Sequence, residues 1–286
     1  MPKTNIPKLV IFGDPQKGKV ARIIKNFEDF AKNDAEIVAS CNINECSSQI
    51  LKEIDFAVVF GGDGSIISAA RYLSSSRVPV IGVNLGKLGF LAEFSFDELT
   101  KSFSQIMSGK APVEERMILG CSMLRNGKEK FHSTAINDVF ISAGAPFRMI
   151  ELKISVDNQP LAGCMSDGMI ISTPTGSTAY NLSAGGPILS GNMEAMVITP
   201  MCPHSLSFRP IVINAQSKVE VVGIRVNEGT TISIDGQVSM KLAADDVVSI
   251  KKEENNFLIV NNPIRTYWET LATKLNWAEK PRYKKP

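Results

Sequence analysis

In the N-terminal part of the chain, short apolar runs alternate with stretches in which apolar residues recur at helical spacing. The apolar runs predict buried strands at Lys8 to Phe12, Glu36 to Ala39, Phe56 to Phe60 and Pro79 to Val83. The helical patterns cover Val20 to Lys32, Ser47 to Glu53, the segment that begins at Ser65, and Phe96 to Met107. Because strands and helices alternate in this way in doubly wound sheets, the pattern predicts a Rossmann-like α/β domain with a parallel sheet.

The pattern changes near Gly109, where short β-type runs separated by turn residues replace the helical periodicity. Candidate strands are Met117 to Arg125, Glu129 to Asn137, Glu151 to Val156, Met169 to Ser172, Ala195 to Thr199, Lys218 to Val222, Thr230 to Ile234 and Val247 to Lys251. Many short strands with turns between them, such as Asp157 to Pro160, indicate an all-β, sandwich-like domain. A helical pattern returns at Pro263 to Asn276. We therefore predict an α/β domain over residues 1–109, a β-sandwich over 110–262, and a C-terminal helix and tail over 263–286 that pack on the first domain.

The composition fits a globular protein of two domains and argues against several classes of function. The chain has 286 residues, of which 44% are hydrophobic and 21% are charged, and its net charge is +2. That charge is too small to indicate a nucleic-acid partner, and the basic tail Lys280 to Lys285 is interpreted as a solvated terminus. No apolar run has the length of a membrane span, and no signal peptide is evident. We therefore expect a cytoplasmic protein with no nucleic-acid or membrane partner.

The cysteines and histidines indicate neither a metal site nor a disulfide framework. The five cysteines are Cys41, Cys46, Cys121, Cys164 and Cys202, an odd number without metal-binding spacing. Free thiols in a reducing compartment are the simplest interpretation. His132 and His204 are the only histidines of the sequence, so no zinc site is predicted and no side chain is assigned to a metal.

The most informative stretch is Phe56 to Ser65, in which an apolar strand stops at Gly61-Gly62-Asp63-Gly64 and a helical pattern begins at once. Ligands of open α/β sheets bind at the carboxyl ends of strands. Glycines there let the backbone approach a phosphate, and the helix N-terminus offers N–H groups to an anion. A carboxylate beside a phosphate site repels the phosphate unless it has a chemical role. We therefore expect that Asp63 either takes a proton from a substrate or holds a metal. A tight turn with Asp63 as a helix cap is the alternative.

Gly13 to Val20 has the glycine and lysine spacing of a P-loop but departs from it in two ways. Val20 stands where a hydroxyl would bind magnesium, and Pro15 removes a backbone N–H from a loop that depends on such donors. We therefore expect an ordinary connection from strand to helix at this position.

A second polar stretch follows the apolar run Met169 to Ser172. Thr175 to Ser183 carries several hydroxyl groups together with Tyr180 and the amide of Asn181. A packed core does not need so many donors, because each one is costly when it is buried without a partner. A solvated Ser/Thr loop is the alternative, but the glycines and the tyrosine favour a site for a polyhydroxylated or phosphorylated ligand.

Three shorter polar stretches are ambiguous by themselves. Asn137-Asp138, at the end of a predicted strand, could read the donors and acceptors of a sugar or purine, or could form a turn. Asp235-Gly236-Gln237 predicts a hairpin turn and nothing more. His204 and the polar residues that follow it up to Pro210 could line a site, although a single histidine in such a place is more often structural.

Taken together, these stretches resemble the NAD kinase family. The matching segments, in the family's order, are Gly61 to Gly64, Asn84 to Leu91, Asn137-Asp138, Ser166 to Gly168, Ser172 to Tyr180 and Pro200 to Pro210. The resemblance covers residues 55–276, which include about half of the predicted α/β domain and all of the predicted β-sandwich, and the N-terminal 50 residues match only in pattern. The Gly-Gly-Asp-Gly motif is shared with diacylglycerol, sphingosine and phosphofructokinase relatives, whereas the run from Thr173 to Tyr180 is far more specific.

The resemblance implies phosphorylation of the adenosine ribose 2′-hydroxyl of NAD to give NADP, with Mg²⁺ and with ATP, or polyphosphate in its place, as the donor. It implies Asp63 as the general base and Gly61, Gly62, Gly64 and Ser65 as phosphate-binding residues. The residues that it implies for NAD are Gly64, Asn137, Asp138, Arg148, Asp167, Thr175, Thr178, Ala179, Tyr180, Asn181, Ser183 and Gln237. Within this set Asn137 and Asp138 would bind the adenosine portion, and Asp167 would contact the nicotinamide end. Family members are dimers or tetramers, so a homo-oligomer is implied.

Two positions depart from the family's pattern. The family usually has Asn-Glu where this chain has Asn137-Asp138, so the adenosine contacts are expected to be rearranged or mediated by water. Many bacterial members carry Arg where this chain has Met165, and Arg148 is the candidate to replace that charge.

Three other functions are less consistent with these residues. A lipid kinase of the diacylglycerol or sphingosine type would need an apolar acyl pocket or a membrane-binding surface, and the hydroxyl-rich run from Thr175 to Ser183 argues against one. A sensor that binds NAD or NADP without turnover has no use for the Asp63 carboxylate. A Rossmann dehydrogenase would carry Gly-x-Gly-x-x-Gly after the first strand, and this chain does not.

Overall fold

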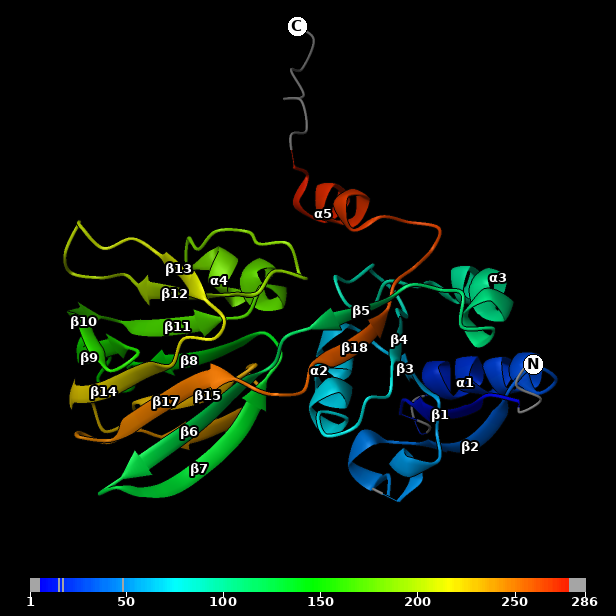
Figure 1. The fold of residues 1–286 in the computed structure, drawn as a ribbon, viewed down its shortest axis with the longest axis horizontal. Helices are drawn as coiled ribbons and strands as arrows, with labels where there is room; N and C mark the ends of the chain where they lie inside the picture. Colours follow the sequence, from blue (N-terminus) through cyan, green and yellow to red (C-terminus); the bar gives the residue numbers. More distant parts are fainter. Residues whose placement is uncertain (1–5, 15, 17, 48, 278–286) are drawn as a thin grey trace, which may run out of the picture. The chain divides into compact units, whose positions relative to one another are not determined.

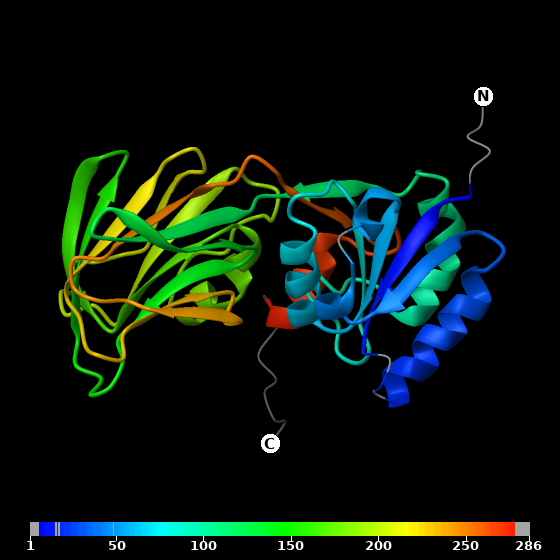
Figure 2. The same ribbon diagram turned by 90° about the horizontal axis from the view of Figure 1, so that it is seen from below.

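The computed structural model describes residues 6–277 except 15, 17 and 48, and it divides the chain into two compact units (Figures 1 and 2). Unit 1 comprises the described residues up to Glu114 and from Leu258 onward, and unit 2 comprises Glu115–Phe257. The predicted divisions at 109 and 262 lie a few residues from these. Pro15 and Lys17 of the P-loop-like segment, and the basic tail from Lys280, are outside the described residues. No helix among the described residues is long and apolar enough to cross a membrane.

Unit 1 is built on a six-stranded sheet in the order β2-β1-β3-β4-β18-β5. The strands are β1 (Lys8–Phe12), β2 (Glu36–Cys41), β3 (Phe56–Phe60), β4 (Val80–Val83), β5 (Val113–Arg116) and β18 (Phe257–Val260). The pairs β1–β2, β1–β3, β3–β4 and β4–β18 are parallel, as predicted for the first four strands. The edge strand β5 makes the whole sheet mixed. β5 and β18 were not predicted, because each is a short strand that lies where the sequence pattern changes.

Helices cover both faces of this sheet (Figure 2). They are α1 (Gly18–Ala31), α2 (Asp63–Tyr72) and α3 (Phe96–Met107), and a further helix, α5 (Tyr267–Leu275), follows β18. α1 and α3 share one face, where the rings of Phe27 and Phe103 meet edge to face with centroids 5.5 Å apart. The predicted helix over residues 47–53 is wrong, because the described part of this stretch, which leaves out residue 48, contains only the 3₁₀ turn η2 (Ile50–Lys52), which follows η1 (Ile43–Glu45). A helix of seven residues with so few apolar positions lacks the packing that would stabilise it.

Unit 2 is an antiparallel β-sandwich of two six-stranded sheets, as predicted for this part of the chain. In one sheet the order is β10 (Gln159–Ser166), β9 (Ile150–Val156), β14 (Val219–Arg225), β17 (Val247–Lys252), β6 (Leu119–Arg125) and β7 (Lys128–Ala135). In the other sheet it is β13 (Ile211–Asn214), β12 (Ala195–Met201), β11 (Gly168–Ser172), β8 (Asp138–Ser142), β15 (Thr231–Ile234) and β16 (Val238–Lys241). Alternate apolar residues of both sheets, such as Leu152 and Ile141, form a single core. The segment after β11 contains the 3₁₀ turn η3 (Thr175–Thr178) and the short helix α4 (Tyr180–Ser183).

The predicted turn at Asp157 joins β9 and β10 into a hairpin. Asp157 and Asn158 have φ angles of 50° and 64°, the left-handed pair that a two-residue hairpin turn needs. β8, β10, β13 and β16 were not predicted. β13 and β16 are the two edges of one sheet, and each has only four residues, none of them fully buried.

Candidate active site

The Gly61-Gly62-Asp63-Gly64 turn lies at the carboxyl end of β3, between β1 and β4 in the sheet. The N–H of Gly61 donates to the carbonyl of Val83 at 2.9 Å and so ties the turn to β4. A Cβ on Gly61 would come within 2.4 Å of the Ser65 hydroxyl, so the sharp entry into α2 requires glycine there. Gly62 is the N-cap of α2, and no side chain caps this helix. The alternative interpretation of Asp63 as a helix cap is therefore wrong.

The Asp63 carboxylate instead accepts hydrogen bonds from three successive backbone N–H groups of the loop that follows β4. Its Oδ1 accepts from Leu91 at 3.0 Å and Ala92 at 2.9 Å, and its Oδ2 accepts from Phe90 at 2.9 Å. A Cβ on Gly89 would lie 1.9 Å from Oδ1, so glycine leaves the room that the carboxylate occupies. Oδ1 is thus saturated, whereas Oδ2 keeps acceptor capacity for a further donor.

A cavity of about 680 Å³ opens beside this turn within unit 1. Gly61, Gly62 and Ser65, three of the four residues predicted to bind phosphate, line it, whereas Gly64 does not. The P-loop-like segment contributes Gly13 and Asp14, and residues 85–87 form another wall. This volume and the exposed backbone of the turn suit a nucleotide with its phosphates.

In unit 2 the Asp235 carboxylate holds the start of β8. Its Oδ1 accepts from the N–H groups of Asn137 at 2.8 Å and Asp138 at 3.1 Å, and its Oδ2 accepts from that of Ile136 at 3.0 Å. Asp235 and Gly236 have φ angles of 52° and 66° and form the predicted hairpin turn, which joins β15 to β16. The sequence analysis predicted the turn but not the bonds, which place the turn against the Asn137-Asp138 pair.

Asp138 is a buried carboxyl group, with 5% of the residue exposed. Burial, and secondly the charge of Asp235, raise the pKa of Asp138 from 3.8 to about 7. Near neutral pH this carboxyl is therefore partly protonated and can donate a hydrogen bond as well as accept one.

A cavity of about 510 Å³ runs along β8 and β15 within unit 2. Asp138, Phe140 and Ser142 of β8 line it, whereas Val139 and Ile141 between them face the core. The other lining residues that matter here are Asn137, Ala179, Tyr180, Thr231 and Ser233. The rings of Phe140 and Tyr180 meet edge to face, with centroids 5.0 Å apart. An aromatic pair beside hydroxyl, amide and carboxyl groups suits a nucleoside.

The hydroxyl-rich segment after β11 is fixed against this cavity by Thr173. The Thr173 hydroxyl donates to the carbonyl of Ile136 at 2.6 Å and accepts from the N–H of Gly176 at 3.0 Å. A Cβ on Gly176 would lie 2.1 Å from the Asn137 carbonyl, so the segment can approach Asn137 only with glycine there. The predicted neighbours Asn137 and Tyr180 are in this way brought to the same cavity.

Two other residues of this segment that were predicted to bind NAD, Asn181 and Thr175, are buried. Asn181 is fully buried; its amide donates to the carbonyls of Ser177 and Pro187, and its Oδ1 accepts from the Thr199 hydroxyl at 2.6 Å. Asn181 therefore stabilises the turn in this structure. The Thr175 hydroxyl is buried without a hydrogen-bond partner, and Thr175 does not line the 510 Å³ cavity.

The remaining predicted residues do not line the 510 Å³ cavity. Arg148 and Asp167 are exposed, in the connections from β8 to β9 and from β10 to β11. Thr178 and Ser183 lie in η3 and α4, and Gln237 follows the Asp235-Gly236 turn. The sequence analysis in turn missed Phe140, Ser142, Thr231 and Ser233. The period-2 alternation of β8 and β15 was the signal that could have found them, because it places these residues on one face.

The comparisons with known proteins point to one family. The chain matches the family models of the ATP-NAD kinase N-terminal domain over residues 16–111 and of the ATP-NAD kinase C-terminal domain over residues 136–262. It is 42% identical over 227 residues to the NAD kinase of Syntrophotalea carbinolica and 45% identical over 226 residues to that of Geobacter sulfurreducens. Each of these alignments covers 79% of this chain and 80% of the relative.

Solved structures show the same fold. Yeast NADH kinase complexed with NADH superposes with a TM-score of 0.86 at 24% identity, covering 99% of this chain and 91% of that one. An NAD kinase from Archaeoglobus fulgidus in complex with ATP superposes with a TM-score of 0.76 at 25% identity, covering 94% and 98%. Because both domain models match and relatives above 40% identity align over 80% of their length, the chain belongs to the NAD kinase family.

Proposed function

We propose that this kinase transfers the terminal phosphate of ATP to the 2′-hydroxyl of the adenosine ribose of NAD and releases NADP, ADP and a proton. The observation that carries the proposal is the Asp63 carboxylate, which lies at the carboxyl end of β3 and is held by three backbone N–H groups. The Archaeoglobus relative was solved in complex with ATP, which supports ATP as the donor.

Asp63 Oδ2 is the oxygen that we assign to the proton transfer. It accepts one backbone hydrogen bond where Oδ1 accepts two, so a substrate hydroxyl can approach it. As the hydroxyl proton moves to Oδ2, the ribose oxygen forms a bond to the terminal phosphorus and the bond from that phosphorus to the bridging oxygen of ADP breaks. Such a transfer depends mainly on positioning and on neutralising charge.

Gly61, Gly62, Gly64 and Ser65 are our candidates for the phosphate-binding turn. Gly61, Gly62 and Ser65 line the 680 Å³ cavity, and the first N–H groups of α2 follow them. The described residues contain no cluster of three or more His, Cys, Asp or Glu side chains that could hold a metal. We therefore propose that Mg²⁺ arrives as a complex with the donor phosphates, which is its usual form in kinases.

The 510 Å³ cavity of unit 2 is our candidate for the adenosine portion of NAD. Asn137 and Asp138 offer an amide and a partly neutral carboxyl group, and the Tyr180 ring offers an apolar face. Asp167 remains the proposed contact for the nicotinamide end. We further propose a cytoplasmic homo-oligomer, a dimer or a tetramer, whose size light scattering would measure.

NADP formation from purified protein, NAD and Mg-ATP tests the proposal. A coupled dehydrogenase specific for NADP reads the product, and reactions without ATP or without NAD are the controls. We expect steady NADP formation that requires both substrates. Tight NAD binding without product would instead indicate a sensor. The absence of both NAD binding and NADP formation would contradict an NAD site.

Tyr180→Ala is expected to weaken NAD binding by about fivefold, because the substitution removes an aromatic face worth about 1 kcal/mol, which is held by an edge-to-face contact with Phe140. The value of kcat should change much less, since Tyr180 has no part in the proton transfer. Calorimetric titration with NAD measures the effect, and Tyr180→Phe, which keeps the ring, is the matched control. An unchanged dissociation constant for Tyr180→Ala would remove this ring from the NAD site.

A further inference from the structure

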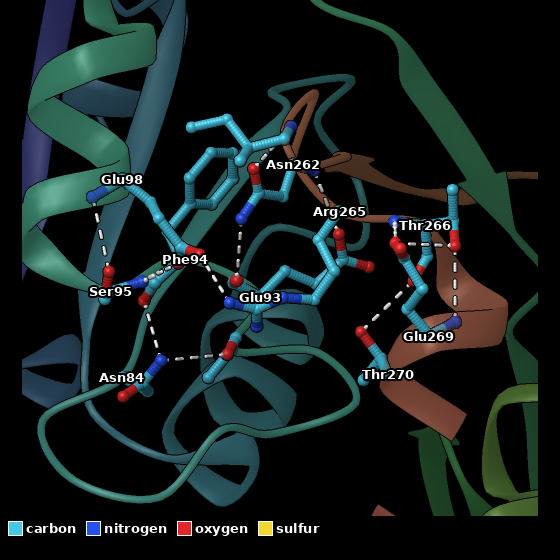
Figure 3. Close-up of polar contacts among 12 residues, drawn as sticks. Asn84, Glu93, Phe94, Ser95, Glu98, Asn262, Arg265, Thr266, Glu269 and Thr270 are labelled. Carbon is cyan, nitrogen blue, oxygen red and sulfur yellow. Dashed lines mark hydrogen bonds and ion pairs between the residues drawn. The ribbon is translucent and has the colours of Figure 1, made fainter. Parts of the chain in front are cut away.

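The C-terminal segment of unit 1 is tied to the residues that follow the Asp63-binding loop (Figure 3). The backbone N–H of Asn262 donates to the Glu93 carboxylate at 3.0 Å, and its side-chain amide donates to the Glu93 carbonyl at 3.1 Å. Arg265 forms an ion pair with Glu98 of α3. These bonds fix the start of α5 relative to the loop, with Glu93 directly after the residues that bind Asp63.

α5 itself begins at a fully formed capping box. The Thr266 hydroxyl accepts from the Glu269 N–H at 3.2 Å, and the Glu269 carboxylate accepts from the Thr266 N–H at 2.8 Å. Figure 3 shows this box next to the Arg265 contact. Both the start of the helix and its direction are thus determined before the chain reaches its last turn, where Lys274 lies.

Lys274 brings a positive charge to the Asp63 carboxylate. Its Nζ lies 3.9 Å from Asp63 Oδ2, the oxygen with free acceptor capacity, and 4.6 Å from the centroid of the Phe90 ring. The backbone N–H of Phe90 donates to the same Oδ2. One ammonium group therefore contacts both the carboxylate and the side chain of the residue that binds it.

We propose that Lys274 is a positioning residue for the general base: it holds Phe90 and Asp63 Oδ2 in the arrangement that receives the substrate proton. The inference rests on the proposed function of Asp63. An ordinary solvated lysine would contact neither group, and at 3.9 Å the ammonium is close enough to attract Oδ2 without occupying its lone pair by a hydrogen bond. A base displaced by about 1 Å loses up to 100-fold in rate, so this modest contact can matter more for turnover than for folding.

The test compares Lys274→Ala, Lys274→Arg and the control Lys101→Ala, an exposed lysine of α3, in the full-length chain. We expect Lys274→Ala to lower kcat by about tenfold while KM for NAD and for ATP changes little. Lys274→Arg, which keeps the charge and the contact with the ring, should retain most of kcat, and Lys101→Ala should match the wild type. A kcat of Lys274→Ala equal to that of the wild type would overturn the proposal, and Lys274→Met serves as the second variant if Lys274→Ala does not fold.

A double-mutant cycle separates positioning of Asp63 from a general loss of structure. Because Lys274 acts through Asp63, Lys274→Ala should lower kcat in the wild type but cause no further loss in the Asp63→Asn background. An equal loss in both backgrounds would overturn the proposal. If the wild-type protein forms no NADP, the proposed function fails. The same four proteins of the cycle are then compared by their midpoints of urea unfolding without ligand. We expect the shift of the midpoint in the double variant to differ from the sum of the two single shifts. Additive shifts would contradict the Lys274–Asp63 contact.

Discussion

Asp63→Asn is expected to lower kcat for NADP formation by about 10²- to 10⁴-fold, the usual contribution of a positioned general base. The amide cannot take the proton of the ribose hydroxyl, so the attacking oxygen would have to lose it to water. NAD binding should be largely kept, because the proposed adenosine site lies on β8 and β15 of unit 2. Coupled NADP assays give kcat, and calorimetric titration with NAD gives the dissociation constant.

The Asp63→Asn substitution is also expected to lower the stability of the folded protein, and the control must separate this effect from the loss of the base. Asn can keep one oxygen toward Leu91 and Ala92, but its amide nitrogen then faces the N–H of Phe90, with which it cannot form a bond. A lost buried hydrogen bond costs about 1 kcal/mol, so folding is checked by urea unfolding. Asp97→Asn, in the first turn of α3, is the matched control and should leave kcat unchanged. If Asp63→Asn turns over at the wild-type rate, Asp63 is not the base.

Local patterns were sufficient to predict the strands β1 to β4 and the helices α1 and α3 of unit 1, and the hairpin turns at Asp157 and Asp235 of unit 2. β3 has the bounds that its continuous apolar run predicts, because it is buried on both faces, and α3 has the bounds that its helical periodicity predicts, because it buries one face. The edge strands β13 and β16 were not found in this way, since each is only four residues long, too short for a pattern to stand out, and none of its side chains is fully buried.

The site was predictable as a set of residues but not as a set of contacts. Asp63 and Asp235 each accept hydrogen bonds from three successive backbone N–H groups, at separations of 27 to 29 and 97 to 99 residues. Backbone donors leave no mark on the sequence, because every residue except proline carries one. The glycine at 89, which makes room for Asp63, was visible only as part of a motif. Asp235 therefore looked like a turn residue although it also orders the start of β8.

The second prediction with a large expected effect concerns the buried Asp138 and the dependence of the free energy of unfolding on pH. Its pKa is 3.8 in the reference state and about 7 in the folded protein, because burial and then Asp235 disfavour the charged form. Below pH 3.8 both states carry the proton and the folded state has no penalty. As pH rises toward 7 the unfolded chain releases the proton first, so stability falls, and above the folded pKa the penalty is constant. From pH 5 to pH 8 the fall attributable to this group is at most about 3 kcal/mol.

Asp138→Asn should therefore flatten the decline of unfolding free energy between pH 5 and pH 8, since the amide has the same size and does not ionise. The variant is expected to be more stable than the wild type at pH 8, with a smaller difference or none at pH 5, in urea titrations at both values. Asp245→Asn is the matched control, an exposed aspartate of the same unit whose left-handed conformation, with φ of 64°, suits Asn. Parallel pH profiles for the wild type and Asp138→Asn would mean that Asp138 is already ionised at pH 5, and its carboxyl could not then act as a neutral donor to adenosine.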